Sequence, residues 1–268
     1  ALPSCEAMEP NQGGIILGKD NNWYFLTHHG TGDWSGRIVS LLPVTWVQDW
    51  PIPGEVLSQN IGTMKWDGKI PFKHTEKLSI KRSDDFDEDC LAPQWQWNYQ
   101  PRKDYFSLTE RPGWLRLKAY RPLETNNLLK AGNTLTQRTF RKQNNDVTIK
   151  MDISNMQDGQ KNGLCHFSSQ HSAIGIVKEE DACYLEYRKN GNITKGIQIH
   201  SEFVWFRTEW GMDGKSQYYY SLDGDNFLPF GEKYQLTWGN YRGDRIGIYC
   251  FNDKKETGSV DVDYCHYR

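Results

Sequence analysis

Two adjacent histidines and a nearby arginine are the residues best suited to hold a ligand in the first part of the sequence. His28 and His29 follow a strand-like run, at a point where loops often carry functional side chains. Arg37 stands at the start of the next such run. A guanidinium fork can hold hydroxyls or a carboxylate in a geometry that lysine does not match. One histidine could line a pocket or both could be turn residues, and Arg37 could equally be a surface arginine.

The other reactive side chains form no complete catalytic motif. The sequence contains no Gly-x-Ser-x-Gly, no His-Glu-x-x-His and no phosphate-binding loop. Glu110 and Glu209 are carboxylates beside strands, but nothing in the sequence pairs them as acid and base. The six cysteines lack metal-binding spacing, so we expect mostly small buried thiols, with a Cys165–Cys183 or a Cys250–Cys265 disulfide as the alternative.

The composition narrows the class of partner. The chain has 268 residues and a formal net charge of -2, so its charge does not favour nucleic acid or an acidic membrane surface. No apolar run approaches the roughly 20 residues of a membrane span. Its 11 Trp and 14 Tyr supply both core side chains and rings that can stack on sugars.

Alternating strand patterns must position these residues, because helical periodicity is nearly absent. Residues 1–72 contain three or four short strands, about one blade of a β-propeller, which is too little to stand alone. Residues 73–89 are a polar linker that ends in an acidic run. Residues 90–268 are dense in strands and predict a two-sheet β-sandwich, a jelly roll of concanavalin-like type. The fold class is therefore all-β.

Large aromatic residues mark that second unit. Trp95, Trp97 and Tyr99 alternate, which places three rings on one face of a strand, as core or as a platform for stacking a ligand. We expect Trp95, Trp97, Trp205 and Trp238 to be largely buried.

The stretch around these rings also resembles a known family. Trp95–Asn98 followed by residues 107–117 is similar to the opening of the C-terminal sandwich of glycoside hydrolase family 43, the β-xylosidase and α-L-arabinofuranosidase type of enzyme. The resemblance covers nearly the whole chain. Further matching segments are residues 11–14, 23–25, 28–33, 36–37, 41–46, 50–54, 133–139, 219–224, 238–247 and 260–264.

This resemblance implies roles for several residues. Residues 1–72 look like the last blade of the family's five-bladed propeller, and Arg37 matches the arginine that reaches the substrate pocket. His28, His29, Asn11 and Gln12 would lie around that pocket, with Asn11 where many members have a histidine near a central metal or water. The family hydrolyses with inversion, using three carboxylates on earlier blades. None of the three matches a position in this chain.

A structural calcium is the one metal that the fold suggests. In jelly-roll sandwiches of this kind, an acidic residue near the start and one near the end often meet on adjacent strands, and Asp85 and Asp263 fit that pattern. Calcium takes six to eight oxygen ligands, so backbone carbonyls would complete the shell. The alternative is a pair of exposed acids on edge strands. We expect no required cofactor.

Three functions remain open from the sequence. The chain could be the C-terminal portion of a glycoside hydrolase acting on xylan or arabinoxylan oligosaccharides. It could be a non-catalytic module that binds xylan or arabinan, or a fragment that completes a partner chain's propeller. Expected partners are thus an oligo- or polysaccharide and another chain or a second copy. The sequence is compatible with a bacterial secreted, periplasmic or cytoplasmic location.

Overall fold

The protein divides into two compact units in a computed structural model that describes residues 11–63, 71, 79–239 and 241–268. The first unit comprises residues 1–80 together with residues 240–243. The second comprises residues 81–239 and 244–268. No helix among the described residues is long and apolar enough to cross a membrane.

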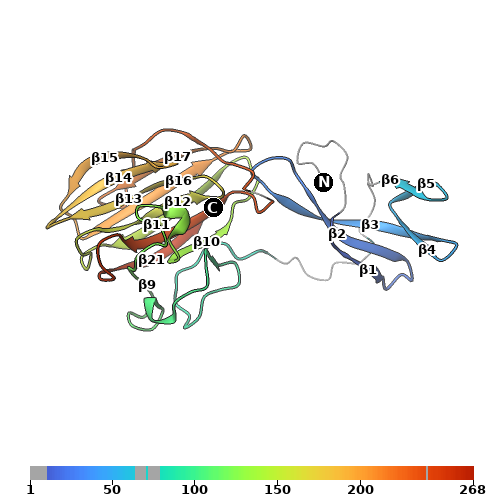
Figure 1. Cartoon of the computed structure of the whole chain (residues 1–268), viewed down its shortest axis with the longest axis horizontal. Coiled ribbons are helices and arrows are strands. Elements are labelled where there is room, and N and C mark those ends of the chain that lie inside the picture. Colours follow the sequence, from blue (N-terminus) through green and yellow to red (C-terminus); the bar gives the residue numbers. More distant parts are fainter. Residues whose placement is uncertain (1–10, 64–70, 72–78, 240) are drawn as a thin grey trace. The chain divides into compact units, whose positions relative to one another are not determined.

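The first unit contains a four-stranded antiparallel sheet in the order β1-β2-β3-β4 (Figure 1), and with the hairpin that follows it has more strands than the three or four that the sequence suggested. Its turns follow local chemistry: Asp20 accepts hydrogen bonds from Asn22 and Tyr24 between β1 and β2, and Gln48 and Asp49 adopt positive φ between β3 and β4. A separate hairpin, β5 and β6, follows the sheet. The bounds are β1(Gly14–Leu17), β2(Trp23–Gly30), β3(Arg37–Val47), β4(Trp50–Pro53), β5(Glu55–Ser58) and β6(Ile61–Thr63).

The second unit is built on two large antiparallel sheets, which confirms the predicted concanavalin-like sandwich (Figure 1). The seven-stranded sheet consists, in spatial order, of β15(Asn192–Ile199), β14(Ala182–Lys189), β13(His171–Glu179), β12(Gln160–Phe167), β20(Arg245–Asn252), β10(Thr134–Arg138) and β7(Gln96–Trp97). The eight-stranded sheet contains β18(Leu228–Pro229), β17(Lys215–Ser221), β16(Phe203–Trp210), β11(Asn145–Asp152), β21(Ser259–Tyr267), β9(Leu115–Lys118) and β8(Phe106–Ser107), with β19(Tyr234–Gln235) paired to β17.

The main core of the second unit is formed by the alternate side chains of both sheets. Leu135 and Ile248 are directly paired on β10 and β20, and Val147 and Ile149 alternate along β11 of the other sheet. These side chains are almost completely buried. Because successive strand residues point to opposite faces, the period-two pattern in the sequence assigns them to the inside.

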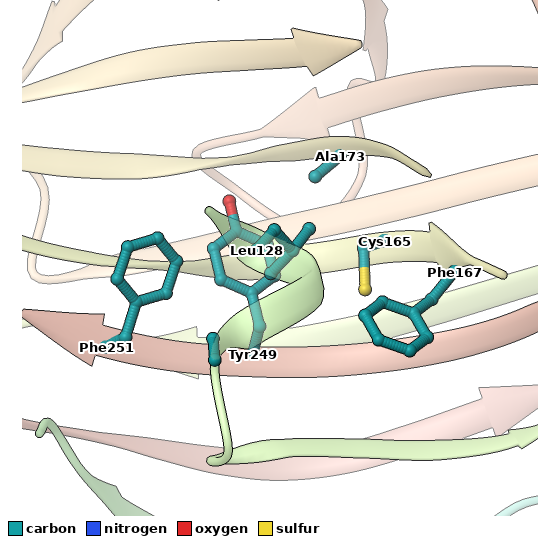
Figure 2. Packing of buried hydrophobic residues seen from close by; sticks show 7 residues of the cluster. Leu128, Cys165, Phe167, Ala173, Tyr249 and Phe251 are labelled. Atoms are coloured by element: carbon teal, nitrogen blue, oxygen red, sulfur yellow. The ribbon is translucent and has the colours of Figure 1, made fainter. Parts of the chain in front are cut away.

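A second, smaller cluster covers the opposite face of the seven-stranded sheet. The short 3₁₀ helix η2(Leu128–Lys130) places the fully buried Leu128 over Ala173 and Tyr249 (Figure 2). Asn127 caps η2 by accepting a hydrogen bond from the Leu129 amide at 3.0 Å. The other short helix, η1(Lys103–Tyr105), precedes β8. The segment that carries η2 therefore covers part of this sheet's outer face. The remaining cluster members are Ala131, Cys165, Phe167 and Phe251.

The boundary between the units lies earlier than the sequence suggested. Residues 81–89 were expected in the linker, yet they group with the sandwich. Asp84 forms a backbone bridge with Cys265, and its carboxylate accepts a 2.7 Å hydrogen bond from Trp95 Nε1. Phe86 is buried beside them, stacked on Trp95. The acidic run looked like a solvated linker in the sequence, but Asp84 and Phe86 within it are buried. Residues 73–78 of the expected linker lie outside the described residues.

Two further expectations concern aromatic residues of the sandwich. Of the four tryptophans expected to be largely buried, Trp95 is buried, and Trp97, Trp205 and Trp238 keep a minor part of their surface exposed. The expected strand through Tyr99 ends at Trp97, because the next side chain, Asn98, turns to bond the carbonyls of Leu129 and Ala131.

The expectation of mostly buried thiols is confirmed for three cysteines, and neither alternative disulfide, Cys165–Cys183 or Cys250–Cys265, is formed. All five cysteines that the structure describes are free. Cys165, Cys250 and Cys265 are buried, as small apolar side chains would be, whereas Cys90 is exposed. Burial raises the pKa of the Cys250 thiol to about 12, which keeps that thiol protonated and unreactive.

Candidate functional site

Arg37 and His28 lie on the same face of the first unit's sheet. Gly30 pairs with Arg37 and His28 pairs with Val39 across β2 and β3. Directly opposed residues of an antiparallel pair share a face, and residues two apart on one strand do so too. Arg37 and His28 are both half-exposed, so a ligand could reach the two side chains from one side of the sheet.

His29 points to the other face. It pairs with Ile38, and its Nδ1 atom lies 2.6 Å from the Ser40 hydroxyl on β3. Partial burial lowers the pKa of His29, and the neighbouring His28 adds to this effect. The side chains of the two histidines, which looked equivalent in the sequence, thus lie on opposite faces of the sheet.

Asn11 and Gln12 run beside β2 next to His28. The Asn11 amide nitrogen donates to the His28 carbonyl at 2.9 Å, and the Thr27 hydroxyl bonds the carbonyls of both Asn11 and Gln12. The Asn11 side chain also donates to the His28 carbonyl, at 3.4 Å. Asn11 and Gln12 therefore lie beside the backbone of β2 at Thr27 and His28, and the contacts of Asn11 with His28 are to its carbonyl and not to its imidazole.

A tight turn sets the position of Arg37. Asp33 accepts hydrogen bonds from the Thr31 hydroxyl and the Ser35 amide, both at 2.8 Å. Gly36 has a φ of 75°, and a Cβ atom there would come within 2.5 Å of the Gly243 amide nitrogen. Only glycine permits this conformation and close approach together. The turn therefore fixes the position of Arg37, which is the first residue of β3.

Tyr241 is the neighbour of Arg37 that sequence reasoning missed. Its ring centroid lies 4.8 Å from the Arg37 guanidinium carbon, a cation–π distance. Tyr241 is 43% exposed and has a positive φ of 74°, which is uncommon for a bulky side chain. The segment of residues 238–247 matched the family motif in the sequence, but no pattern linked it to Arg37.

The two glutamates considered as an acid–base pair are far apart. Glu209 pairs with Asp146 near the first residues of β11. Glu110 bonds Arg116 and Lys118 of β9, beyond the opposite end of β11 and two strands away. These two basic groups lower the pKa of Glu110, Lys118 having the larger effect. Glycoside hydrolysis by an acid–base pair needs two carboxyl groups within roughly 10 Å of each other, so Glu110 and Glu209 are not placed for that reaction.

The two aspartates expected to hold calcium have separate partners. Asp85 lies 2.7 Å from His266 Nε2, and Asp263 accepts a 2.8 Å hydrogen bond from Lys150. Within the described ranges, no three His, Cys, Asp or Glu side chains are grouped to hold a metal ion. The calcium site stays a prediction, with both carboxylates already bonded to basic side chains.

Comparison with known proteins gives a consistent result. Residues 83–268 match the family of β-xylosidase C-terminal concanavalin A-like domains of glycoside hydrolase family 43. The chain is 34% identical over 281 aligned residues to a β-xylosidase of Formosa agariphila, an alignment that covers 96% of this chain and 47% of that protein.

Solved structures show the same relationship. A bifunctional GH43-CE protein of Bacteroides eggerthii superposes with a TM-score of 0.77 at 27% identity, covering 97% of this chain and 34% of that one. A xylan β-1,4-xylosidase of Bacillus halodurans shares the fold with a TM-score of 0.78 at 18% identity, covering 99% of this chain and 54% of that one. The chain thus spans about half of these relatives or less, and it corresponds to their C-terminal portion.

Proposed function

Because this chain belongs to the glycoside hydrolase family 43 group of β-xylosidase C-terminal concanavalin A-like domains, we propose that it is the C-terminal portion of such a hydrolase. Its substrates would be xylan or arabinoxylan oligosaccharides. The four-stranded sheet serves as one blade of the catalytic propeller and supplies part of the pocket wall. The observation that carries the proposal is the shared face of Arg37 and His28, beside Tyr241, in a chain that spans about half of its relatives.

In this function Arg37 binds the substrate and performs no proton transfer. Its guanidinium donates hydrogen bonds to hydroxyls of the sugar at the cleavage site, and the Tyr241 ring limits the orientations that the side chain can adopt. Such a fixed donor favours the transition state when it is already in place before the reaction begins. His28, on the same face, adds a second group that can bond a hydroxyl.

The acid and base are supplied outside the residues described here. Inverting hydrolysis requires a carboxylic acid beside the leaving oxygen and a carboxylate that activates water on the opposite side of the sugar. Asp33, the carboxylate nearest Arg37 in sequence, is engaged within its own turn. The chain alone is therefore expected to show no turnover of aryl xylosides or aryl arabinofuranosides above background.

The test supplies the acid and base by joining this chain to part of a relative. This chain is fused to the propeller region of the Formosa relative, and hydrolysis of 4-nitrophenyl β-D-xyloside and α-L-arabinofuranoside is measured. Arg37→Ala should lower kcat/KM at least about tenfold, which corresponds to about 1.4 kcal/mol of transition-state stabilisation. His28→Ala should also lower kcat/KM.

His29→Ala is the matched control, because its side chain lies on the opposite face and should leave kcat/KM within about twofold. Strong turnover by the unfused chain would contradict the proposal, as would an active fusion that does not respond to Arg37→Ala.

A further inference from the structure

A hollow of about 510 Å³ lies in the second unit, at one end of the outer face that η2 partly covers. Its walls come from three places: the segment leading into η2, the turn between β12 and β13, and the turn between β14 and β15. This volume falls in the usual range of small-molecule sites. The lining residues are Asn126, Asn127, Leu129, Ser169, Gln170, His171, Asn190 and Gly191.

The lining is polar but carries no Lys, Arg, Asp or Glu side chain. Amides, a hydroxyl and an imidazole provide both donors and acceptors. Some of these groups are already used for structure: Asn127 caps η2, and Asn190 Oδ1 accepts from the His171 amide at 2.9 Å. In the part of the chain that the structure describes, no protein group bonds the Ser169 hydroxyl or the Gln170 side-chain nitrogen Nε2, so both can serve a ligand; Gln170 Oε1 accepts from Asn190 Nδ2 at 3.2 Å.

His171 is the buried polar group of this site. It is only 6% exposed, and its Nδ1 atom has no hydrogen-bond partner within the described residues. Burial, assisted by the charge of nearby Arg188, lowers the pKa of His171 to about 4, so the ring is neutral near pH 7. A neutral imidazole offers one donor and one acceptor, and a buried polar atom without a partner is costly. The Nδ1 atom has almost no exposed surface, so a ligand hydroxyl can bond it and relieve that cost only after a small shift of the side chains that line the hollow.

Arg188, next to His171, has its charge balanced inside the protein. Its guanidinium pairs with the buried Glu186, and its Nη1 atom donates to Asn126 Oδ1 at 2.8 Å. The Nη2 atom is buried and has no hydrogen-bond partner among the described residues. The cation therefore supports the wall of the hollow through Asn126 without giving the lining a net charge.

A neighbouring hollow on the same outer face shows the contrast. It is larger, about 720 Å³, but its charged side chains pair with one another, as Lys195 does with Glu179 at 2.5 Å. The ring of Tyr184 in that hollow is covered by the Lys195 ammonium at 3.6 Å. Several charged groups of that hollow are therefore paired with one another, whereas the hollow around His171 has no charged side chain in its lining.

We propose that the hollow around His171 binds a neutral sugar, as a site separate from the hydrolytic pocket. A phosphate or carboxylate ligand would need a cation in the lining, and a metal ion would need carboxylates. A peptide strand would need a row of free backbone donors and acceptors, which these turns do not present. The vicinal hydroxyls of a sugar match closely spaced amide and imidazole groups. The choice of pentose oligosaccharides as probes rests on the proposed function, but the site itself does not.

The test measures binding of xylotriose and arabinotriose to the whole chain by saturation-transfer NMR and calorimetry. We expect at least one of the two to bind, and His171→Leu to weaken the affinity at least about tenfold. Gln170→Ala should weaken it about threefold. Gln198→Ala, an exposed glutamine on β15 outside the hollow, is the matched control and should change nothing.

A thermal unfolding curve checks that His171→Leu is folded. If it is not, Gln170→Ala and the exposed substitution Ser169→Glu carry the test, and both should weaken binding. Absence of binding by both trisaccharides would overturn the proposal. So would binding that survives the substitutions in the hollow, or binding that is lost only in Arg37→Ala. The last result would support the hydrolytic pocket instead, so the two proposals fail separately.

Discussion

The sheet of the first unit and the sandwich of the second use similar strands but bury them very differently. In the sandwich, Ile149 and Leu117 lie between two sheets and are 0% exposed. In the first unit, Ile38 and Val39 are adjacent on β3, hence on opposite faces, and are 47% and 74% exposed. Within the described residues, the first sheet therefore has apolar side chains open to solvent on both sides.

This difference shows what each unit needs in order to be stable. Exposed apolar patches of this kind are uncommon on a finished domain and indicate a surface that another element covers. A single sheet without a second layer is marginal in water, whereas the sandwich supplies its own second layer. The sandwich thus provides both layers of its own core, whereas the described part of the first sheet leaves apolar side chains uncovered. That is the arrangement expected for one blade of a propeller.

The largest effect should come from truncating a core side chain of the sandwich. Ile149→Ala removes methyl groups from a completely buried site, so it should lower the free energy of unfolding by about 2–5 kcal/mol. Val39→Ala, the matched change in the first sheet, should alter it by no more than about 0.5 kcal/mol. Denaturant unfolding measures both. Equal losses would mean that the first sheet is as well packed as the sandwich.

A second effect depends on pH and is confined to the sandwich. The folded-state pKa of His171 is lowered to about 4 from a model-compound value of 6.5, so between these values the unfolded chain binds a proton that the folded one does not. Stability should therefore fall as the pH drops from 6.5 to 4, by at most about 3.4 kcal/mol.

The variant His171→Leu isolates this contribution. Its stability, measured at pH 7 and pH 4.5, should decline less than that of the wild type over the same interval. Parallel declines in the two proteins would show that His171 titrates normally in the folded state.

A smaller effect tests the boundary between the two regions. Asp84→Ala removes the acceptor of the Trp95 Nε1 and Phe86 amide hydrogen bonds, leaving two buried donors without a partner. The expected loss is about 1–3 kcal/mol in the unfolding of the sandwich. Asp87→Ala, an exposed member of the same acidic run, is the control and should be nearly neutral. If Asp84→Ala left the free energy of unfolding unchanged, residues 81–89 would be better described as a linker than as part of the sandwich.

Local patterns in the sequence predicted most of the strands, because burial on one face imposes period two. The runs at residues 147–151 and 245–249 became β11 and β20 with little change. What could not be predicted depends on contacts distant in sequence. Tyr241 meets Arg37, and Asp84 meets Cys265, through folding that no local pattern encodes.

The candidate sites show the same limit. Once β2 is known to continue through both histidines, the alternation of side chains along a strand places His28 and His29 on opposite faces of the sheet. The hollow around His171 is lined by three segments that are distant in sequence. The buried His171 nitrogen without a hydrogen-bond partner can be recognised only in the folded structure. The resemblance in the sequence identified the family, but the residues quoted for it did not include His171.

The sandwich buries its apolar side chains between its own two sheets, whereas the first sheet leaves apolar side chains exposed on both faces. Hydrogen–deuterium exchange of the purified chain tests this difference most directly, because amide protection reports local opening. We expect the amides of β12, β20 and β11 to exchange at least about a hundredfold more slowly than those of β2 and β3. Fusion to a propeller region should then raise protection in β2 and β3 alone. Equal protection of both regions in the unfused chain would contradict the claim.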